Sequence, residues 1–369
     1  MEAVTIHLKS AIDRTYDILI EPGLIRKVAK DLKKQEIGHR YLVVTDTNVA
    51  DLIGKNFIES LRAEGLQCDL FAIPAGEESK RWETVLRIAD RMTTLGLDRG
   101  SAVIALGGGV VGDIAGFSAA IYMRGIPYIQ VPTTLLAQID SSVGGKTGID
   151  TEHGKNLLGA FHQPARVYID PDLLNTLPEA EIKNGLAEMI KYAVIKDSEL
   201  FETLENSRDQ VMQLEASLIT RLITRCCEIK GEVVEKDEKE GGLRRILNFG
   251  HTIGHGIEAA SGFTIPHGAA VSIGMAAVAK LSRVEGFISE DVEQKIVDLL
   301  RQYRLPVEVP SSIKWNTVFH HMKSDKKFVG GISFFVLVKR IGEVFVYDKL
   351  GLERVEAVLS DSNFSKKSG

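Results

Sequence analysis

The chain has 369 residues, of which 44% are hydrophobic and 26% charged, a composition typical of a globular protein large enough for two domains. The formal net charge of −5 argues against a dedicated nucleic-acid-binding protein, because such proteins usually carry an excess of basic residues. With no apolar run of the roughly 18 residues that a membrane span needs, no signal-peptide layout and only three cysteines (Cys68, Cys226 and Cys227), the sequence predicts a cytoplasmic protein with free thiols.

The first half of the chain alternates short apolar runs with helical patterns. Four runs have the length and composition of buried strands: 41–46, 68–74, 101–106 and 128–132. Buried strands separated by helices indicate a mainly parallel sheet, whose ligands bind at the carboxyl ends of the strands. Those ends carry Asp46, the glycines 107–109, and Thr133 with Thr134. The N-terminal residues 1–10 also alternate like a strand.

A glycine-rich loop follows the third of these runs. "GGGVVGD" (Gly107–Asp113) fits the pattern G-x-G-x-x-G, in which glycines let backbone N–H groups approach a phosphate at a helix N-terminus. The acid expected at the end of the next strand is missing, because "YIQVPTT" has threonines there. Asp46 ends an earlier strand and could hold a ribose hydroxyl instead. The pattern therefore predicts a dinucleotide site of non-standard layout.

A second glycine-rich segment, "DSSVGGKTG" (Asp140–Gly148), resembles a P-loop only superficially. The first glycine of G-x-x-x-x-G-K-T would fall at Asp140, and no strand leads directly into the segment. Lys146 here and Lys155 in "HGKN" are expected in neighbouring glycine-bearing loops, where they suit an anionic ligand.

The sequence pattern changes between Leu177 and Ile182. We expect an α/β domain at residues 1–180 and a mainly α-helical domain at residues 181–369. Helical spacing continues from Leu200 to about Tyr303, and "GISFFVLVKRIGEVFVYD" (Gly331–Asp348) predicts two short strands around Ile341 and Gly342. The last ten residues are expected to be disordered.

Three of the nine histidines lie in "NFGHTIGHGIEAASGFTIPHG" (Asn248–Gly268). His251 and His255 are four residues apart and share a face if the helix is continuous, whereas His267 is expected in a loop after Pro266. Glu188 lies mid-helix among apolar residues in "GLAEMIKYAV", where a carboxylate needs a compensating charge. Three histidines and such a glutamate predict a divalent metal site, with the choice of ligands among the histidines open. The motif is not H-E-x-x-H, so a zincin protease is disfavoured.

Basic residues recur near these segments. They are Arg124, Lys191, Lys230, Arg244, Lys326 and Lys327. If they converge in a net-acidic protein, they mark a site for an anion with several charges, such as a phosphate plus a carboxylate.

Five long motifs in this order give the chain a specific resemblance: "GGGVVGDIAGF", "MRGIPYIQVPTTLLAQIDSSVGGKTGID", "KNLLGAFHQP", "GLAEMIKYAVI" and "GLRRILNFGHTIGHGIEA". Together they resemble the 3-dehydroquinate synthase family over roughly Asp46 to Gly342. The resemblance implies a Rossmann-like NAD-binding α/β domain, a mostly helical metal-binding domain, an active site in the cleft between them, and a homodimer. It also implies conversion of 3-deoxy-D-arabino-heptulosonate 7-phosphate to 3-dehydroquinate and phosphate in the shikimate pathway, with bound NAD⁺ and Zn²⁺ or Co²⁺.

The resemblance also implies roles for individual residues. The metal ligands would be Glu188, His251 and His267. The NAD contacts would be Asp46, Glu77, Lys80, Gly109, Val110, Asp113, Thr133, Thr134, Lys146, Lys155, Leu173 and Thr176. The catalytic and substrate contacts would be Arg124, Asp140, Lys146, Asn156, Lys191, Lys230, Glu240, Arg244, Asn248, His255 and Lys327. One departure from the family pattern is Ala75, where many relatives have Asp, at the adenosine end of the NAD site.

The implied reaction has five steps: oxidation, phosphate elimination, reduction, ring opening and aldol closure. NAD⁺ accepts and returns the hydride, the metal polarises the reacting oxygens, and the cationic groups orient the substrate. His255, with Asn248 nearby, is expected to handle protons at the hydroxyl that is oxidised. The substrate's own phosphate can serve as the base for elimination.

Three other functions compete with this predicted function. Other sugar-phosphate cyclases, such as 2-epi-5-epi-valiolone synthase and 2-deoxy-scyllo-inosose synthase, are disfavoured. The reason is that the residues that would contact the carboxylate-bearing substrate of the 3-dehydroquinate synthase family are all present: Arg124, Asn156, Asn248 and His255. Metal-dependent alcohol dehydrogenases, such as glycerol dehydrogenase, are disfavoured by the fuller loop "DSSVGGKTGID". A non-catalytic binding protein predicts losses among these positions, and none is lost.

Overall fold

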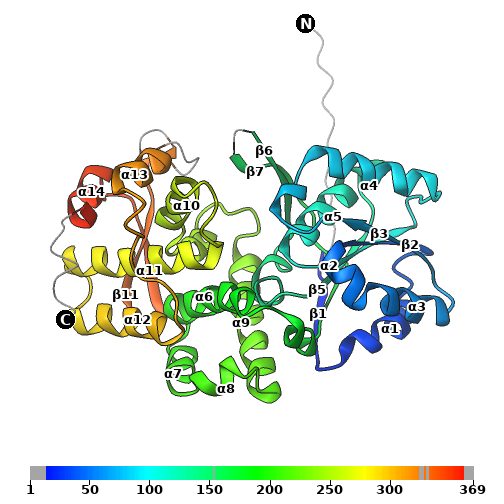
Figure 1. The fold of residues 1–369 in the computed structure, drawn as a ribbon, viewed down its shortest axis with the longest axis horizontal. Coiled ribbons are helices and arrows are strands. Elements are labelled where there is room, and N and C mark those ends of the chain that lie inside the picture. The colour runs from blue at the N-terminus through cyan, green and yellow to red at the C-terminus, as the bar shows by residue number, and fades with distance from the viewer. Residues whose placement is uncertain (1–13, 153, 324–327, 330–331, 361–369) are drawn as a thin grey trace, which may run out of the picture.

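The computed structural model describes residues 14–152, 154–323, 328–329 and 332–360 (Figure 1). For residues 328–329 and 332–333 it describes the backbone alone. Two domains lie side by side, an α/β domain built on a parallel sheet and a mainly helical domain. Three expectations fall on residues outside the described ranges: the strand in residues 1–10, the disorder of residues 361–369, and the role of the basic pair Lys326 and Lys327. Ser360, the first of the ten residues expected to be disordered, instead ends a helix. The boundary expected after residue 180 falls in the first turn of a helix and stays a prediction.

A six-stranded parallel sheet forms the centre of the N-terminal domain. In spatial order its strands are β1 (Asp17–Ile20), β8 (Arg166–Ile169), β5 (Tyr128–Pro132), β4 (Ala102–Gly107), β2 (Arg40–Asp46) and β3 (Gln67–Ile73). The four strands expected from apolar runs are β2, β3, β4 and β5, and every pair in the sheet is parallel, as predicted. The sequence did not predict β1 and β8, which have only four residues each.

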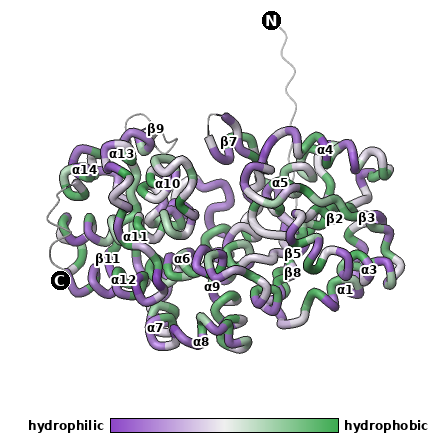
Figure 2. Tube along the Cα trace, viewed as in Figure 1, coloured by the Kyte–Doolittle hydropathy of each residue, from purple (hydrophilic) through white to green (hydrophobic). Residues whose placement is uncertain are grey.

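Helices cover both faces of the sheet. They are α1 (Val28–Gln35), α3 (Lys55–Ala63), α4 (Trp82–Thr94) and α5 (Gly109–Ile121). Successive residues of β2 belong to two different cores, because Val44 packs with α4 and α5 whereas Val43 packs with α1 and α3. Burial on both faces explains why the central strands are hydrophobic along their length rather than alternating (Figure 2).

The strand order reverses between β2 and β4. The chain runs from β2 outward to β3 and then returns to the other side of β2 to form β4. Ligands of open α/β sheets bind in the crevice at such a reversal, outside the carboxyl ends of the strands. Those ends carry Asp46 and Gly107, so the topology directs a ligand toward the two features that the sequence singled out.

Lys146 and Lys155 do not lie in loops, and this part of the sequence prediction was wrong. They belong to β6 (Lys146–Thr151) and β7 (Gly154–Phe161), an antiparallel hairpin separate from the main sheet. Gly148 and Gly159 face each other in it, and a Cβ at either would meet a backbone oxygen at 2.7 or 2.4 Å. The glycines that indicated a loop instead allow two strands to pair closely.

Short helical turns connect the elements of this domain. They are η1 (Leu24–Arg26), α2 (Thr47–Val49), η2 (Ala50–Gly54), η3 (Glu77–Ser79), η4 (Tyr122–Arg124), η5 (Ala137–Ser141) and η6 (Pro171–Thr176).

The C-terminal domain is mainly helical, as expected. Its helices are α6 (Glu179–Lys196), α7 (Ser198–Asn206), α8 (Arg208–Met212), α9 (Ala216–Lys236), η7 (Leu243–Asn248), α10 (His251–Ala260), α11 (His267–Val284), α12 (Glu290–Gln302), α13 (Trp315–Lys323) and α14 (Leu352–Ser360). The two strands expected around Ile341 and Gly342 are β11 (Phe335–Arg340) and β12 (Glu343–Tyr347), and β9 (Phe328–Val329) pairs with β10 (Ile332–Ser333). No helix among the described residues is long and apolar enough to cross a membrane.

Helices α6 and α11 form the buried centre of this domain. Most residues on every side of both helices are buried, which is typical of a helix enclosed by others. Glycines bring α10 close to α11: a Cβ at Gly274 would lie 2.0 Å from the carbonyl oxygen of Gly250. This contact holds the N-terminus of α10, where His251 lies, against the middle of α11, whose first residue is His267.

Replacing Gly274 with Ala should therefore force α10 and α11 apart. We expect Gly274→Ala to lower the free energy of unfolding by about 2 kcal/mol, because the added methyl group has no space. Gly231→Ala is the matched control on α9, where a Cβ meets no atom within 4 Å. It should raise stability by up to about 1 kcal/mol. Urea denaturation of both variants checks this, and equal stabilities would contradict the close packing.

Candidate active site

A cleft of about 2090 Å³ lies between the carboxyl edge of the sheet and the helices α10 and α11. A pocket for one small ligand usually has roughly 300–1,000 Å³, so this cleft has room for two ligands side by side. Most of the predicted site residues line it: Asp46, Glu77, Lys80, Gly109, Val110, Asp113, Thr133, Thr134, Asp140, Lys146, Lys155, Asn156, Leu173, Thr176, Lys230, Glu240, Asn248, His255 and His267.

Five other predicted residues within the described part of the chain do not line the cleft. Glu188, Lys191, Arg244 and His251 are buried. Arg124 is exposed in η4 and lies outside the lining of the cleft, so its contact with a ligand stays a prediction. Lys327 lies outside the described residues.

One wall of the cleft is the glycine loop at the strand-order reversal. The helix α5 begins at Gly109, so its first backbone N–H groups lie at the cleft, as an anion-binding helix N-terminus requires. Asp46 caps α2 from the end of β2, and its Oδ1 accepts hydrogen bonds from the backbone of Asn48 and Val49 at 2.9 and 3.0 Å. The other carboxylate oxygen of Asp46 can still accept a bond from a ligand hydroxyl.

Lys80 organises the polar residues beside this wall. Its ammonium lies 2.6 Å from Asp113 Oδ2 and donates to Asn156 Oδ1 at 2.5 Å. Burial lowers the pKa of Lys80, but the carboxylates of Asp113 and Glu77 outweigh burial and raise it above its ordinary value. Lys80 therefore holds a permanent charge between the predicted cofactor contacts and Asn156.

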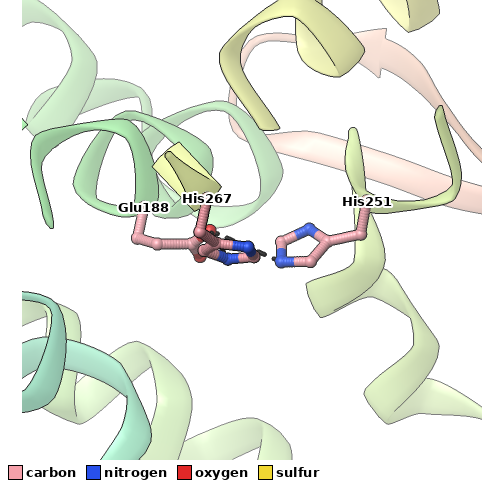
Figure 3. Close-up of side chains that lie close together, drawn as sticks. All are labelled: Glu188, His251 and His267. Carbon is pink, nitrogen blue, oxygen red and sulfur yellow. Dashed lines mark ion pairs between the residues drawn. The ribbon is translucent and has the colours of Figure 1, made fainter. Parts of the chain in front are cut away.

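Glu188 faces two histidines on the opposite wall (Figure 3). Its Oε1 lies 3.4 Å from Nε2 of His251 and 3.5 Å from Nε2 of His267. One ligand atom from each of the three residues lies within 4.8 Å of the others. The Lys191 ammonium contacts Oε2, yet neither carboxylate oxygen of Glu188 accepts a well-directed hydrogen bond from the described residues. Two imidazoles and a buried, under-bonded carboxylate are a donor set that fits a divalent metal with open positions.

The electrostatics of these three groups favour a cation between them. Burial raises the pKa of Glu188, but Lys191 and the two histidines outweigh burial and hold it well below its ordinary value. Burial lowers the pKa of His251 well below its ordinary value. Burial also lowers the pKa of His267, but the nearby carboxylates of Glu188 and Glu258 outweigh it and raise that pKa to about 10. The site thus attracts positive charge, which a metal ion can supply in place of the proton on His267.

The structure corrects the expected position of His267. This residue does not lie in a loop but is the first residue of α11, with Pro266 as the N-cap. Asn184 Oδ1, one turn before Glu188 on α6, accepts the backbone N–H of Gly268. This bond fixes the start of α11 against α6, and it thereby aligns His267 with Glu188.

A second buried cluster surrounds Asp140. Its carboxylate contacts Lys230 and accepts a hydrogen bond from the Tyr192 hydroxyl at 2.6 Å, and Lys230 Nζ also donates to the Asp140 carbonyl at 2.6 Å. Burial raises the pKa of Asp140, but Lys230 and Lys191 outweigh it and hold that pKa below its ordinary value. The carboxylates of Asp140 and Glu188 thus balance two ammonium groups, as buried charges require.

Two ion pairs join the hairpin β6–β7 to the C-terminal domain across the cleft. Lys146 on β6 contacts Glu240 Oε2, and Asn248 Nδ2 donates to Glu240 Oε1 at 2.9 Å. Lys155 on β7 lies 3.8 Å from Glu258 Oε1 on α10. Residues of both domains therefore meet at one place that a ligand can reach.

The Arg244 side chain forms hydrogen bonds with backbone carbonyl groups. Its guanidinium donates to the carbonyl oxygens of Glu238 and Gly144 at 2.5 and 3.1 Å. This brace holds the loop before β6 against the chain that follows α9, and a direct contact of Arg244 with a ligand stays a prediction.

Three predicted site residues have a left-handed backbone. Arg124, Asn156 and Glu240 have φ values of 71°, 55° and 60°. Such conformations cost non-glycine residues on the order of 1–3 kcal/mol and concentrate at functional sites. The strain at these positions supports a role beyond folding.

Sequence reasoning missed Glu258 and Tyr192. Glu258 is 5% exposed and lies 3.4 Å from Nδ1 of His267 and 4.0 Å from Nε2 of His255. Its spacing from His255, three residues along the same helix, was a signal for it. Tyr192 had no such signal, because its partner Asp140 is distant in the sequence.

Two family models match the chain. One, described as 3-dehydroquinate synthase N-terminal, matches residues 70–184, and the other, 3-dehydroquinate synthase C-terminal, matches residues 185–328. The 3-dehydroquinate synthase of Desulforamulus reducens is 46% identical over 349 residues, which is 94% of this chain and 97% of the relative. That of Pelobacter propionicus is 45% identical over 94% of this chain and 96% of the relative.

Solved structures of related enzymes have the same fold. A 2-epi-5-epi-valiolone synthase from Streptomyces hygroscopicus with NAD⁺ and Zn²⁺ bound has a TM-score of 0.88 and 31% identity, covering 96% of this chain and 98% of its own. A 2-deoxy-scyllo-inosose synthase complexed with carbaglucose-6-phosphate, NAD⁺ and Co²⁺ has a TM-score of 0.83 and 27% identity, covering 94% and 96%. A probable glycerol dehydrogenase from Sinorhizobium meliloti, 16% identical with a TM-score of 0.62 over 93% and 94%, shares the fold alone.

The geometry predicts different roles for the histidines in metal binding. We expect His267→Ala to lose tightly bound Zn²⁺, because a ligand facing Glu188 is removed. His255→Ala should retain it, because His255 does not belong to the group of Glu188, His251 and His267. Metal content after gel filtration, measured by plasma emission spectrometry, checks this. Equal retention in both variants would refute the division.

Proposed function

The chain belongs to the 3-dehydroquinate synthase family, and on that premise we propose how its cleft converts 3-deoxy-D-arabino-heptulosonate 7-phosphate to 3-dehydroquinate and phosphate. The observation that carries the proposal is the group of Glu188, His251 and His267, because its member His267 lines the same cleft as a glycine loop at a strand-order reversal. A donor set for a metal thus lies opposite a site for a dinucleotide.

When bound, NAD⁺ would supply reversible hydride transfer and Zn²⁺ or Co²⁺ would supply a Lewis acid for the oxygens of the substrate. Glu188, His251 and His267 would hold the metal. Their buried position fits this role, because Glu188 keeps a negative charge that only cations compensate.

The residues at the carboxyl edge of the sheet would hold NAD⁺. Asp46 would accept a hydrogen bond from a ribose hydroxyl, and the backbone N–H groups from Gly109 onward would bind the pyrophosphate. The other contacts in this group are Glu77, Lys80, Val110, Asp113, Thr133, Thr134, Lys146, Lys155, Leu173 and Thr176. All of them line the cleft, which supports the assignment.

The cationic residues would orient the substrate. Its phosphate and carboxylate need several positive partners, and the ammonium groups of Lys146 and Lys230 line the cleft, with Lys191 buried beside Asp140. Asn156 and Asn248 add hydrogen-bonding groups. Fixed partners of this kind hold the reacting groups in position, which accelerates the reaction.

His255 would move the proton at the hydroxyl that is oxidised. Its side chain lines the cleft, and its ring lies 5.4 Å from that of His251 and 6.1 Å from that of His267. A histidine beside the metal group, and outside it, is placed to accept a proton there. Arg124, Asp140, Glu240, Arg244 and Lys327 complete the proposed set of catalytic and substrate residues.

The other sugar-phosphate cyclases are the second candidate, because solved members superpose closely on this chain. Identity to the valiolone synthase is 31%, compared with 46% to a 3-dehydroquinate synthase over similar coverage. The sequence therefore favours a substrate that bears a carboxylate.

We also propose a homodimer that works in the cytoplasm, with a domain boundary after residue 180. Exposed apolar side chains gather on the neighbouring helices α4 and α5 and just beyond them: Trp82, Leu86, Ile121 and Met123. A second copy of the chain can cover such a surface.

The three cysteines are free and buried, which supports a reducing compartment.

A phosphate-release assay tests the proposed reaction. With the heptulosonate phosphate, catalytic NAD⁺ and Zn²⁺ or Co²⁺, we expect phosphate release without net accumulation of NADH, because the cofactor is regenerated in each turnover. A heptulose phosphate that lacks the carboxylate should react at least tenfold more slowly. No phosphate release, or NADH formed in proportion to substrate, would contradict the proposal.

The oligomeric state has a direct measurement. Light scattering after gel filtration should give twice the chain mass of 40.5 kDa. Trp82→Glu should shift the mass toward the monomer, because a charge would be buried in the interface. A monomeric wild-type protein would refute the homodimer.

A further inference from the structure

Glu258 is a buried carboxylate that the reaction described above does not use. It lies on α10, three residues after His255 and seven after His251, and only 5% of its surface is exposed. A carboxylate in such a position is costly unless it has charged partners. Its partners come from three separate parts of the chain, which indicates a positioning role at the point where they meet.

The first partner is a proposed metal ligand. Oε2 of Glu258 lies 3.4 Å from Nδ1 of His267, while Nε2 of the same ring faces Glu188 at 3.5 Å. A ring that donates its Nδ1 proton to a carboxylate keeps Nε2 unprotonated and directs its lone pair at the cation.

His251 is held in the same way by another acceptor. Its Nδ1 lies 3.0 Å from the carbonyl oxygen of Phe249, and its Nε2 faces Glu188. Both imidazoles therefore present Nε2 to the same point. His251 depends on a backbone carbonyl for this orientation, whereas His267 depends on a side chain that can be replaced.

The second and third partners connect Glu258 to the rest of the cleft. Oε2 lies 4.0 Å from Nε2 of His255, and Oε1 lies 3.8 Å from the ammonium of Lys155 on the hairpin β6–β7. That ammonium also lies 3.3 Å from Glu77 and 4.8 Å from the ring centre of Phe263. The carboxylate is thus held at both oxygens and cannot turn away from His267 without breaking the contact with Lys155.

We propose that Glu258 is a positioning residue of the metal site, which orients His267 through Nδ1 so that Nε2 binds the metal. The inference rests on the proposed metal site at Glu188, His251 and His267, and it adds a residue that never touches the metal. Removing the carboxylate charge should leave the fold intact and weaken metal binding. Outer carboxylates of this kind typically contribute roughly 10–100-fold to metal affinity.

Metal affinity, measured without substrate, tests the proposal. Zn²⁺ binding to metal-free Glu258→Gln is measured by competition with a chromophoric chelator, beside the wild type and Glu258→Asp. We expect Glu258→Gln to bind Zn²⁺ roughly 10–100-fold more weakly than the wild type, and Glu258→Asp to recover part of the loss. Glu293→Gln is the matched control, because Glu293 is also buried and ion-paired, with Arg283, but lies outside the cleft. It should bind Zn²⁺ as the wild type does.

The outcomes separate the possible failures. Thermal melting of the metal-free variants should show that Glu258→Gln folds as the wild type does; if it does not, Glu258→Asp carries the test. Wild-type Zn²⁺ affinity in a folded Glu258 variant would overturn the positioning role. So would an anomalous-scattering map of the Zn²⁺-loaded protein with a Glu258 oxygen within about 2.2 Å of the metal, because Glu258 would then be a ligand. A wild-type protein that binds no Zn²⁺ would instead refute the proposed metal site itself.

Discussion

The buried carboxylate of Glu188 is the constraint on which the active-site half of the molecule depends. It is fully buried and negatively charged, so the fold must bring cations to it. Lys191 comes from the next turn of the same helix, and His251 and His267 come from the starts of two others. A neutral residue at position 188 would leave Lys191 buried without a partner, which is strongly destabilising. The stability of the fold and the binding of a metal therefore both favour a carboxylate at position 188.

The close packing of three helices converts this charge requirement into geometry. Gly250 and Gly274 bring α10 against α11, and Asn184 fixes the start of α11 on α6. Both histidines are the first residues of their helices, where the backbone is held by these contacts. A ligand set on rigid helices keeps its shape better than one on loops, which suits a site that must bind one metal during several chemical steps.

The sequence predicted what local pattern encodes and missed what depends on distant contacts. The apolar runs gave β2 to β5, because burial on both faces leaves continuous hydrophobic stretches. Spacing alone favoured His251 and His255 as a pair, since i and i+4 share a helix face, and only the family resemblance separated them. That separation stays a prediction: Glu188 groups with His251 and His267, and His255 groups with Glu258 and the same His267. The strands carrying Lys146 and Lys155 were missed because their paired glycines also indicate a loop, and Glu258 was missed because its partner His267 starts another helix.

The fold alone does not decide the chemistry, because enzymes with different reactions share it. The charges across the cleft are more informative. Lys146 is half exposed and contacts Glu240, and an exposed ion pair of this kind contributes about 1 kcal/mol or less. A phosphate group, which carries more negative charge than the Glu240 carboxylate, can therefore replace Glu240 as the partner of Lys146 at small cost. Lys191 and Lys230, by contrast, are buried and ion-paired with Glu188 and Asp140, respectively. The cleft thus combines an outer cation, Lys146, that can change partners with an inner one, Lys230, that is held by Asp140, an arrangement suited to binding an anion in a fixed position.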